Sequence, residues 1–122
     1  MKKHQAALVA VMTAVLAACG SANYKTQSVD EFAATVATPG VVVLDVRHAD
    51  EFAAGHLANA INIDVEGPEF ATQIESLDKS VAYAIYCHSG RRSKIAVDQM
   101  SKAGFTSLYN LAGGISAWAA AG

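Results

Sequence analysis

The residues best suited to chemistry lie at positions 87–93, which read Cys-His-Ser-Gly-Arg-Arg-Ser. Cys87 offers a single thiol, and the guanidinium groups of Arg91 and Arg92 follow it closely. The thiolate is the nucleophilic form of cysteine, and nearby positive charge lowers the pKa of a thiol. This spacing indicates a reactive thiolate in a loop that can also hold an anion. A buried, unreactive cysteine beside two solvated arginines is the alternative interpretation.

Two elements are expected to position this loop. The apolar run 81–86 is typical of a buried strand, and residues 93–103 are typical of a helix that ends before Gly104. Backbone N–H groups between a strand and a helix converge on the centre of the turn, where the helix dipole adds positive potential. Gly90 allows the backbone conformations that such a tight loop needs. We therefore expect the pKa of Cys87 to lie below that of a free thiol.

The rest of the chain alternates helical and strand patterns. Helices are predicted at 28–37, 49–54, 68–77 and 115–120, and strands at 41–46, 60–63 and 107–111. Such alternation is typical of an α/β domain with a mostly parallel sheet. Ligands of these folds bind beyond the carboxyl ends of the strands, which is where Cys87 lies.

The N-terminus has the layout of a secretory signal peptide, with a basic start and an uncharged apolar run that is too short to span a bilayer. Leu16-Ala17-Ala18-Cys19 resembles the bacterial lipobox, which implies that Cys19 is acylated and begins the mature chain. The predicted organisation is a signal peptide (1–18), a lipidated tether (19–25) and one small domain (26–122). We expect an exported cell-envelope lipoprotein, on the periplasmic side where the host has two membranes.

Composition narrows the classes of function. Nine Lys and Arg against eleven Asp and Glu give a net charge of −2, so we expect no nucleic-acid partner. With Cys19 acylated and in contact with the membrane, Cys87 is the single thiol and no internal disulfide can form. His48, His56 and His88 lack the spacing of metal ligands, so we expect neither a metal nor another cofactor.

Four motifs in order resemble the rhodanese family of sulfurtransferases. They are Asp45-Val46-Arg47, the segment from Glu51-Phe52 through Gly55-His56-Leu57 to Ala60–Ile63, the loop Cys87–Ser93, and Leu111–Trp118 with Gly113-Gly114 inside it. The resemblance covers nearly the whole predicted domain. It implies a rhodanese-like three-layer α/β/α fold of the single-domain type, with Cys87 cycling between thiol and persulfide.

Loop length favours sulfur transfer over phosphate chemistry. Four residues separate Cys87 from Arg92, whereas phosphatases that share this fold place five between cysteine and arginine. Position 93, where a phosphatase would need its arginine, holds Ser93. Phosphatase or arsenate-reductase activity is kept as a minor alternative, because Arg92 and the backbone can still bind an oxyanion.

The predicted reaction starts with attack of the Cys87 thiolate on thiosulfate or a similar donor, which leaves a persulfide for transfer to cyanide or a thiol. The substrate-binding residues are predicted to be His88, Ser89, Gly90, Arg91, Arg92 and Ser93. Arg91 and Arg92 are the expected recruiters of donor oxygens, and Arg92 is expected to turn into the loop. His88 is expected at the pocket mouth or simply exposed.

Other matched residues are interpreted as structural support. Asp45 is expected to accept hydrogen bonds from loop N–H groups or from Arg47, because a buried charge must be paired. Arg47 and Glu51 stand four apart and are predicted to pair. His56 is expected to make a supporting hydrogen bond. Leu111 and Trp118 are predicted to be core residues.

Two other classes of function stay open. One is a sulfur carrier or interaction module that receives persulfide from a protein partner, with little turnover on small donors; the sequence names no such partner. The other is an inert rhodanese-like module of an envelope assembly, against which the intact Cys87 argues. Two arginines beside Cys87 favour small oxyanion donors over a protein-docking carrier.

Overall fold

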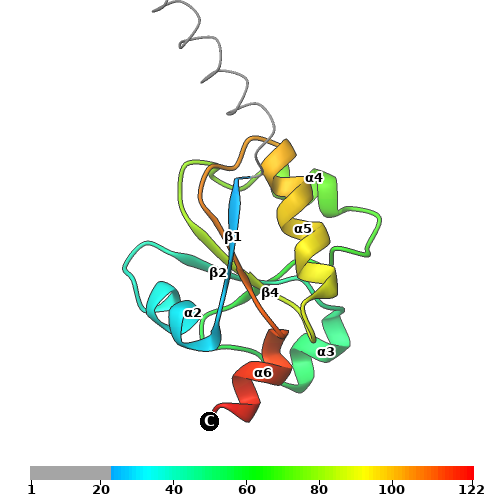
Figure 1. Cartoon of the computed structure of the whole chain (residues 1–122). Coiled ribbons are helices and arrows are strands. Elements are labelled where there is room, and N and C mark those ends of the chain that lie inside the picture. Colours follow the sequence, from blue (N-terminus) through cyan, green and yellow to red (C-terminus); the bar gives the residue numbers. More distant parts are fainter. Residues whose placement is uncertain (1–22) are drawn as a thin grey trace, which may run out of the picture.

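The computed structural model describes residues 23–122, which form one parallel sheet with helices on both faces (Figure 1). The strand order is β1-β5-β4-β2-β3, and every strand pair is parallel. The strands are β1 (Tyr24–Gln27), β2 (Val42–Asp45), β3 (Ile61–Asn62), β4 (Tyr83–Tyr86) and β5 (Leu108–Leu111). The helices are α2 (Val29–Val36), α3 (Ala49–Ala54), α4 (Phe70–Glu75), α5 (Arg91–Lys102) and α6 (Gly114–Ala120).

Two hydrophobic clusters separate the layers. On one face of the sheet, α4 and α5 bury side chains such as Phe70 and Met100 against the strands. On the other face, Phe32 of α2 is fully buried, and α6 packs beside it. The predicted three-layer α/β/α arrangement with a parallel sheet is therefore confirmed.

The strand β1 was not predicted, because the sequence Tyr-Lys-Thr-Gln carries no apolar run or alternation. It lies at the edge of the sheet and pairs with β5, with Tyr24 opposite Leu108 and Gln27 opposite Leu111. The predicted tether was wrong at its end, since residues 24 and 25 already belong to the sheet. Signal peptide 1–18 and Cys19 lie outside the described residues.

The predicted elements are all present, and their ends differ from the prediction by at most two residues. The capping box predicted before α2 is formed, with Ser28 Oγ accepting from the Glu31 N–H and Glu31 Oε1 accepting from the Ser28 N–H. In the part of the chain that the structure covers, no helix has the length and apolar character needed to cross a membrane.

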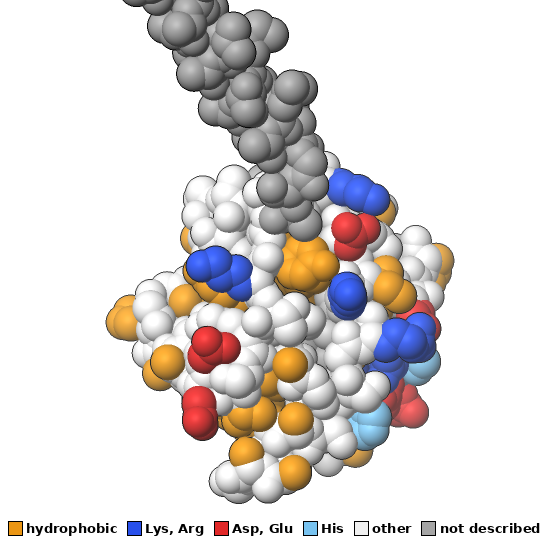
Figure 2. Space-filling model, in the orientation of Figure 1, with side chains coloured by type: hydrophobic (Ala, Val, Ile, Leu, Met, Phe, Trp, Pro, Cys, Tyr) orange, Lys and Arg blue, Asp and Glu red, His pale blue; other side chains and the backbone are white. Residues whose placement is uncertain are grey.

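The carboxyl ends of the strands share one edge of the sheet, because all strands run in the same direction. Asp45 at the end of β2 stands opposite Tyr86 at the end of β4, so the segments after both strands lie side by side. Charged and histidine side chains gather on one side of the surface, toward α3 and the start of α5 (Figure 2). This edge holds the residues singled out by the sequence.

Candidate active site

Cys87 follows β4 directly, and α5 begins at Arg91, two residues before the predicted start. The loop between them is therefore shorter than expected. Gly90 takes a left-handed conformation with φ 109° and stands at the N-cap of α5, so the chain turns into the helix at once. His88 and Ser89 are exposed on this loop, whereas Cys87 is 1% exposed.

The thiol of Cys87 is surrounded by hydrogen-bonding groups. Its Sγ accepts from the Gly90 N–H at 3.0 Å and lies 3.4 Å from Ser93 Oγ. Burial raises the pKa of Cys87, but hydrogen bonds from the Ser93 hydroxyl and from the N–H groups of Ser93, Gly90 and Ser89 outweigh it and lower the pKa overall. Cys87 is thus both buried and activated. Hydrogen bonds from the loop lower the pKa of its thiol more than the charge of the arginines does.

The N-terminus of α6 supports the loop from below. The N–H of Ile115 donates to the Cys87 carbonyl at 2.8 Å, and the N–H of Ser116 donates to the His88 carbonyl at 3.0 Å. Gly114 lies so close that an added Cβ would sit 2.4 Å from the His88 oxygen. The sequence predicted only a turn at Gly113-Gly114, although adjacent glycines before a helix are a signal for close backbone approach.

Arg92 has a partner that the sequence did not indicate. Its guanidinium makes two hydrogen bonds to the Glu51 carboxylate, at 2.8 and 2.9 Å, and its side chain is only 13% exposed, while its predicted part in donor binding stays a prediction. Hydrogen bonding from Arg92 lowers the pKa of Glu51 to about 2. Arg92 therefore ties α5 to α3, and Arg91, whose side chain is 71% exposed, is the freer of the two arginines.

Asp45 and Arg47 form a buried ion pair at the end of β2. Arg47 Nη2 donates to Asp45 Oδ2 at 2.6 Å and also to the Gly55 carbonyl at 2.6 Å. The Arg47 N–H donates to Asp45 Oδ1 at 2.9 Å. This confirms Arg47 as the partner of Asp45, and the predicted Arg47–Glu51 pair is wrong because Glu51 binds Arg92 instead.

His56 has a local role in the turn after α3. Its ring stacks on Phe52 with 3.7 Å between ring centroids, and its Nδ1 is 2.8 Å from the Phe52 carbonyl. The ring thus fastens the segment after α3 to the helix itself, as a supporting residue would.

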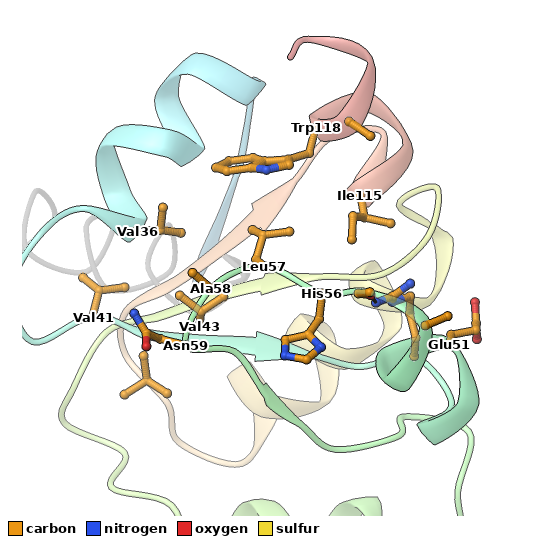
Figure 3. Close-up of a pocket in the computed structure, with 15 residues that line it drawn as sticks. Val36, Val41, Val43, Glu51, His56, Leu57, Ala58, Asn59, Ile115 and Trp118 are labelled. Carbon is orange, nitrogen blue, oxygen red and sulfur yellow. Dashed lines mark hydrogen bonds between the residues drawn. The ribbon is translucent and has the colours of Figure 1, made fainter.

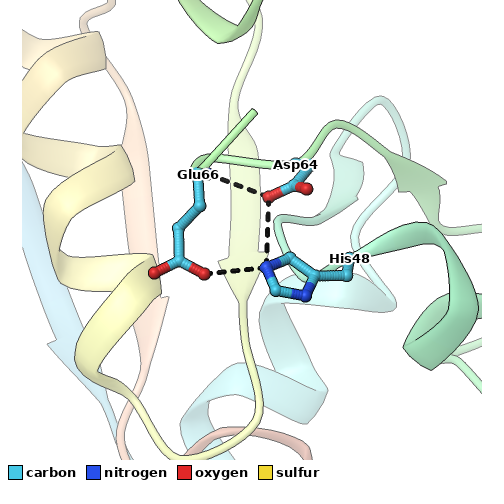
Figure 4. A group of neighbouring side chains, drawn as sticks. All are labelled: His48, Asp64 and Glu66. Atoms are coloured by element: carbon cyan, nitrogen blue, oxygen red, sulfur yellow. Dashed lines mark hydrogen bonds and ion pairs between the residues drawn. The ribbon is translucent and has the colours of Figure 1, made fainter. Parts of the chain in front are cut away.

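A group of ionisable side chains beside the loop was missed by sequence reasoning (Figure 4). His48 Nε2 lies 2.8 Å from Glu66 Oε1 and 4.0 Å from Asp64 Oδ1. The hydrogen bond to Glu66 is the main cause that raises the pKa of His48, and the Asp64 charge adds to it. We call this surface the rim; its members are His48, Glu51, Asp64, Glu66, Arg91 and Arg92.

The rim includes atoms that could reach a common ion, one each from His48, Asp64 and Glu66. Their contacts are those of a hydrogen-bonded ion cluster, and the expectation of no metal site stays a prediction. No local sequence pattern indicated Glu66, because it reaches the loop only through the path of the chain after β3.

A cavity of about 840 Å³ lies on the α2 and α6 face of the sheet (Figure 3). Val36, Val43, Ile115 and Trp118 contribute apolar walls. Trp118 was predicted to be core but is only half-buried and lines this cavity, with its ring edge-on to Phe32 at 6.1 Å. The prediction for Leu111 is confirmed, since it is fully buried. Cys87 does not line the cavity.

Residues 28–121 match the family model described as the rhodanese-like domain. The chain belongs to the rhodanese-like domain family. This family assignment agrees with the observed fold, and the matched range includes Cys87, whose role as the reactive cysteine stays a prediction.

Relatives with curated names include sulfurtransferases. The chain is 36% identical over 113 residues to the senescence-associated protein DIN1 of Raphanus sativus, covering 84% of this chain and 62% of that one. It is 30% identical over 80 residues to the thiosulfate sulfurtransferase GlpE of a Coxiella burnetii strain, covering 66% and 73%. The chain thus spans less than two thirds of the radish protein.

Solved structures of the family superpose well on this rhodanese-like domain. A rhodanese-related protein from Thermoplasma volcanium matches with a TM-score of 0.71 at 30% identity, covering 81% of this chain and 94% of that one. A rhodanese-like domain protein from Staphylococcus aureus matches with a TM-score of 0.68 at 29% identity, covering 77% and 90%. The chain therefore belongs to a family whose members include proteins named thiosulfate sulfurtransferase.

Proposed function

We propose that this rhodanese-like domain transfers sulfane sulfur through a Cys87 persulfide. The observation that carries the proposal is the setting of Cys87 Sγ, which accepts from the Gly90 N–H at 3.0 Å and lies 3.4 Å from Ser93 Oγ. Two curated relatives that carry the name thiosulfate sulfurtransferase support the choice of donor. The donor is thiosulfate or a similar compound, and the acceptor is cyanide or a thiol.

In the first step, the Cys87 thiolate attacks the outer sulfur of thiosulfate. A new S–S bond forms at Cys87, the S–S bond of thiosulfate breaks, and sulfite leaves with the electron pair. In the second step, cyanide or an acceptor thiolate attacks the outer sulfur of the persulfide and releases the Cys87 thiolate. Donor and acceptor therefore react in turn, which gives ping-pong kinetics.

The loop stabilises the persulfide by fixed hydrogen bonds. The outer sulfur of the persulfide is anionic near neutral pH, and N–H groups at the start of a helix are suited to hold an anion. Gly90 stands at the N-cap of α5, a helix of 12 residues, so the dipole of that helix points at the thiol. Arg91, whose side chain is 71% exposed, is the arginine more accessible to a donor anion that approaches the loop.

Intact-mass spectrometry tests this proposal. The domain from Asn23 onward is incubated with thiosulfate, and we expect a mass gain of one sulfur atom that disappears when cyanide is added. Cys87→Ser is the control and should gain nothing. If the wild-type domain takes up no sulfur from thiosulfate or from a persulfide donor, the proposed function is wrong.

A second candidate function is a sulfur carrier that receives its sulfur from a protein persulfide. It is favoured by the pairing of both loop arginines with carboxylates, Arg92 with Glu51 and Arg91 with Glu66, which reduces the positive charge offered to a small dianion. The two candidate functions can be distinguished by comparing how fully each kind of donor loads sulfur onto Cys87. A carrier would load fully from a protein persulfide and only weakly from thiosulfate.

A further inference from the structure

Glu66 contacts both arginines that follow Cys87. Its Oε2 lies 3.7 Å from Arg91 Nη2, and its Oε1 lies 3.8 Å from Arg92 Nη1, so within residues 23–122 it is the one carboxylate paired with both loop arginines. The same Oε1 is 2.8 Å from His48 Nε2 (Figure 4). The exposed carboxylate of Glu66 thus lies within ion-pair distance of both loop arginines and of His48.

The charge seen by an incoming donor follows from the members of the rim. Glu51, Asp64 and Glu66 contribute three negative charges against the two positive charges of Arg91 and Arg92. Hydrogen bonding to Glu51 raises the pKa of Arg92 most, and attraction to the charges of Cys87 and Glu66 adds to it. The guanidinium of Arg92 therefore lies within the field of both the thiolate and the Glu66 carboxylate.

We propose that Glu66 is a specificity-determining residue that selects against dianionic sulfur donors and favours donors with a single negative charge. Thiosulfate carries two negative charges, whereas an alkyl persulfide or a thiosulfonate carries one. Repulsion grows in proportion to donor charge, so the Glu66 carboxylate disfavours thiosulfate more strongly. This inference rests on the proposed sulfur transfer and names the class of donor that the site takes.

The position of Glu66 allows it to act on charge without holding the fold together. Its carboxylate is 42% exposed, while its backbone is fixed by a hydrogen bond from its N–H to Asp64 Oδ1 at 2.8 Å. The two short hydrogen bonds between Arg92 and Glu51 do not involve it. Replacing the carboxylate by an amide should therefore leave the loop in place and remove one negative charge.

A pair of donors with the same chemistry and different charge tests the inference. Cys87 attacks the outer sulfur of thiosulfate to release sulfite, and attacks the outer sulfur of methanethiosulfonate, a monoanion, to release methanesulfinate. In both reactions the S–S bond of the donor breaks, and its electron pair leaves with the sulfite or the methanesulfinate. The measured quantity is the ratio of kcat/KM for thiosulfate to kcat/KM for methanethiosulfonate, at low ionic strength and with cyanide as acceptor.

We expect Glu66→Gln to raise this ratio about threefold, since one charge at about 8 Å in surroundings close to water changes affinity about threefold per unit of donor charge. This rise in the ratio should be smaller in high salt, because the Debye length falls to about 3 Å at 1 M ionic strength. The matched control is Glu75→Gln at the end of α4. It removes the same charge from an exposed ion pair, the one between Glu75 and Lys79. This control should leave the ratio unchanged.

The outcomes separate the inference from the function on which it rests. An unchanged ratio in Glu66→Gln, or an equal rise in Glu75→Gln, overturns the role of Glu66 and leaves sulfur transfer intact. A wild-type domain that takes sulfur from neither donor overturns the inference, and one that also takes none from a persulfide donor overturns the proposed function. A wild type that uses only methanethiosulfonate, with thiosulfate use appearing in Glu66→Gln, supports the inference most strongly.

Discussion

At the scale of single residues, the reactivity of Cys87 depends on a hydroxyl. Ser93 is fully buried, and its Oγ lies 3.4 Å from Cys87 Sγ and donates to the Gly90 carbonyl at 3.3 Å. While Cys87 is protonated, its thiol donates to Ser93 Oγ; once the thiol has lost its proton, the Ser93 hydroxyl can turn from the Gly90 carbonyl and donate to the thiolate, which lowers the pKa of Cys87. Ser93 is therefore part of the chemistry of the loop as well as the first turn of α5.

Ser93→Ala should make Cys87 a weaker nucleophile. Loss of one hydrogen bond of about 0.5 to 1.5 kcal/mol should raise the pKa of Cys87 and slow its alkylation near neutral pH by about two- to tenfold. Iodoacetamide alkylation measured against pH reports both effects. Ser89→Ala is the control, because the Ser89 side chain is exposed and only its backbone N–H acts on the thiolate. Equal rates for the two variants would contradict this role of Ser93.

His48 should make donor choice depend on pH. Its pKa is raised, first by the hydrogen bond to Glu66 and then by Asp64 and the Glu66 charge, while Arg92 opposes this. The groups that face it are Glu51, Asp64, Glu66, Arg92 and the neighbouring Asp50. As the pH falls through this raised pKa, His48 becomes protonated and offsets part of the negative charge of the rim.

As the pH falls and His48 becomes protonated, we expect the ratio of kcat/KM for thiosulfate to that for methanethiosulfonate to rise about threefold. Above the pKa of His48 the ratio should be constant. The ratio cancels the titration of Cys87, since both donors need the same thiolate. In His48→Gln the ratio should not change with pH. A pH-dependent ratio that survives this substitution would assign the effect to another group.

At the scale of elements, α6 determines the shape of the loop. Gly114 has φ +62°, and a Cβ there would lie 2.4 Å from the His88 oxygen and 2.6 Å from the Cys87 oxygen. These are the carbonyls that accept from the N–H groups of Ile115 and Ser116. The start of α6 can therefore approach the loop only as glycine.

Gly114→Ala should push α6 away from the loop, with a loss of about 3 kcal/mol in the free energy of unfolding and more than tenfold in the rate of persulfide formation. Chemical denaturation and intact-mass kinetics measure the two quantities. Gly67→Ala is the control, because its φ is ordinary and a Cβ there, 3.3 Å from the Asp64 oxygen, needs a shift of only a few tenths of an ångström. It should stay within about 1 kcal/mol of the wild type. A fully stable, active Gly114→Ala would show that this close approach is not needed.

The pair of Arg92 and Glu51 fastens α5 to α3. The pKa of Glu51 is lowered to about 2 by the hydrogen bond from Arg92, so its contribution to stability is complete above the unfolded pKa and is lost as the pH falls from about 5 toward 2. Glu51→Gln should cost about 2 kcal/mol at pH 7, less than the full shift implies because water screens the partly exposed carboxylate.

Urea denaturation at several pH values tests this expectation. The difference in unfolding free energy between wild type and Glu51→Gln should shrink toward pH 2. Glu75→Gln serves again as control and should cost less than about 0.5 kcal/mol, since its exposed pair with Lys79 is of the weak i,i+4 type. A difference that stays constant with pH would mean that Glu51 acts by packing and not by its charge.

At the scale of the whole molecule, the first described residues and the reactive loop lie at opposite ends of the sheet. Tyr24 begins β1 opposite Leu108, the first residue of β5, whereas Cys87 follows the last residue of the parallel strand β4. We propose that the chain is an exported lipoprotein acylated on Cys19, as its lipobox implies. An anchor before β1 would then leave the loop facing away from the membrane.

The anchor can be tested by mass spectrometry of the full chain expressed in a bacterial host. We expect the membrane fraction to contain a chain that begins at Cys19 and carries added acyl groups, while Cys19→Ser should leave the membrane fraction. Cys87 should react with a membrane-impermeant maleimide at the same rate in the anchored and the anchor-free chain. Slower labelling of the anchored form would contradict the proposed orientation.

The features of this protein that depend on local pattern could be predicted from the amino-acid sequence alone. The run before Cys87 is apolar throughout and the residues after it have helical periodicity, so the position of the loop, the α/β class and the rhodanese resemblance could all be predicted. Hydrophobic periodicity and turn chemistry act between near neighbours, and a linear pattern records them. The edge strand β1 was missed for the same reason, since its polar residues carry no such pattern.

Which charged side chains meet depends on the packing of segments that lie far apart in the sequence. Arg92 binds Glu51 of α3, and Glu66 reaches Arg92 from the segment after β3. Gly114 likewise contacts a loop that precedes it by many residues. An ion pair or a close backbone contact forms wherever folding brings its members within a few ångströms, and sequence spacing does not encode that distance. The nucleophile is therefore predictable from the sequence, and its electrostatic surroundings follow from the packing of separate elements.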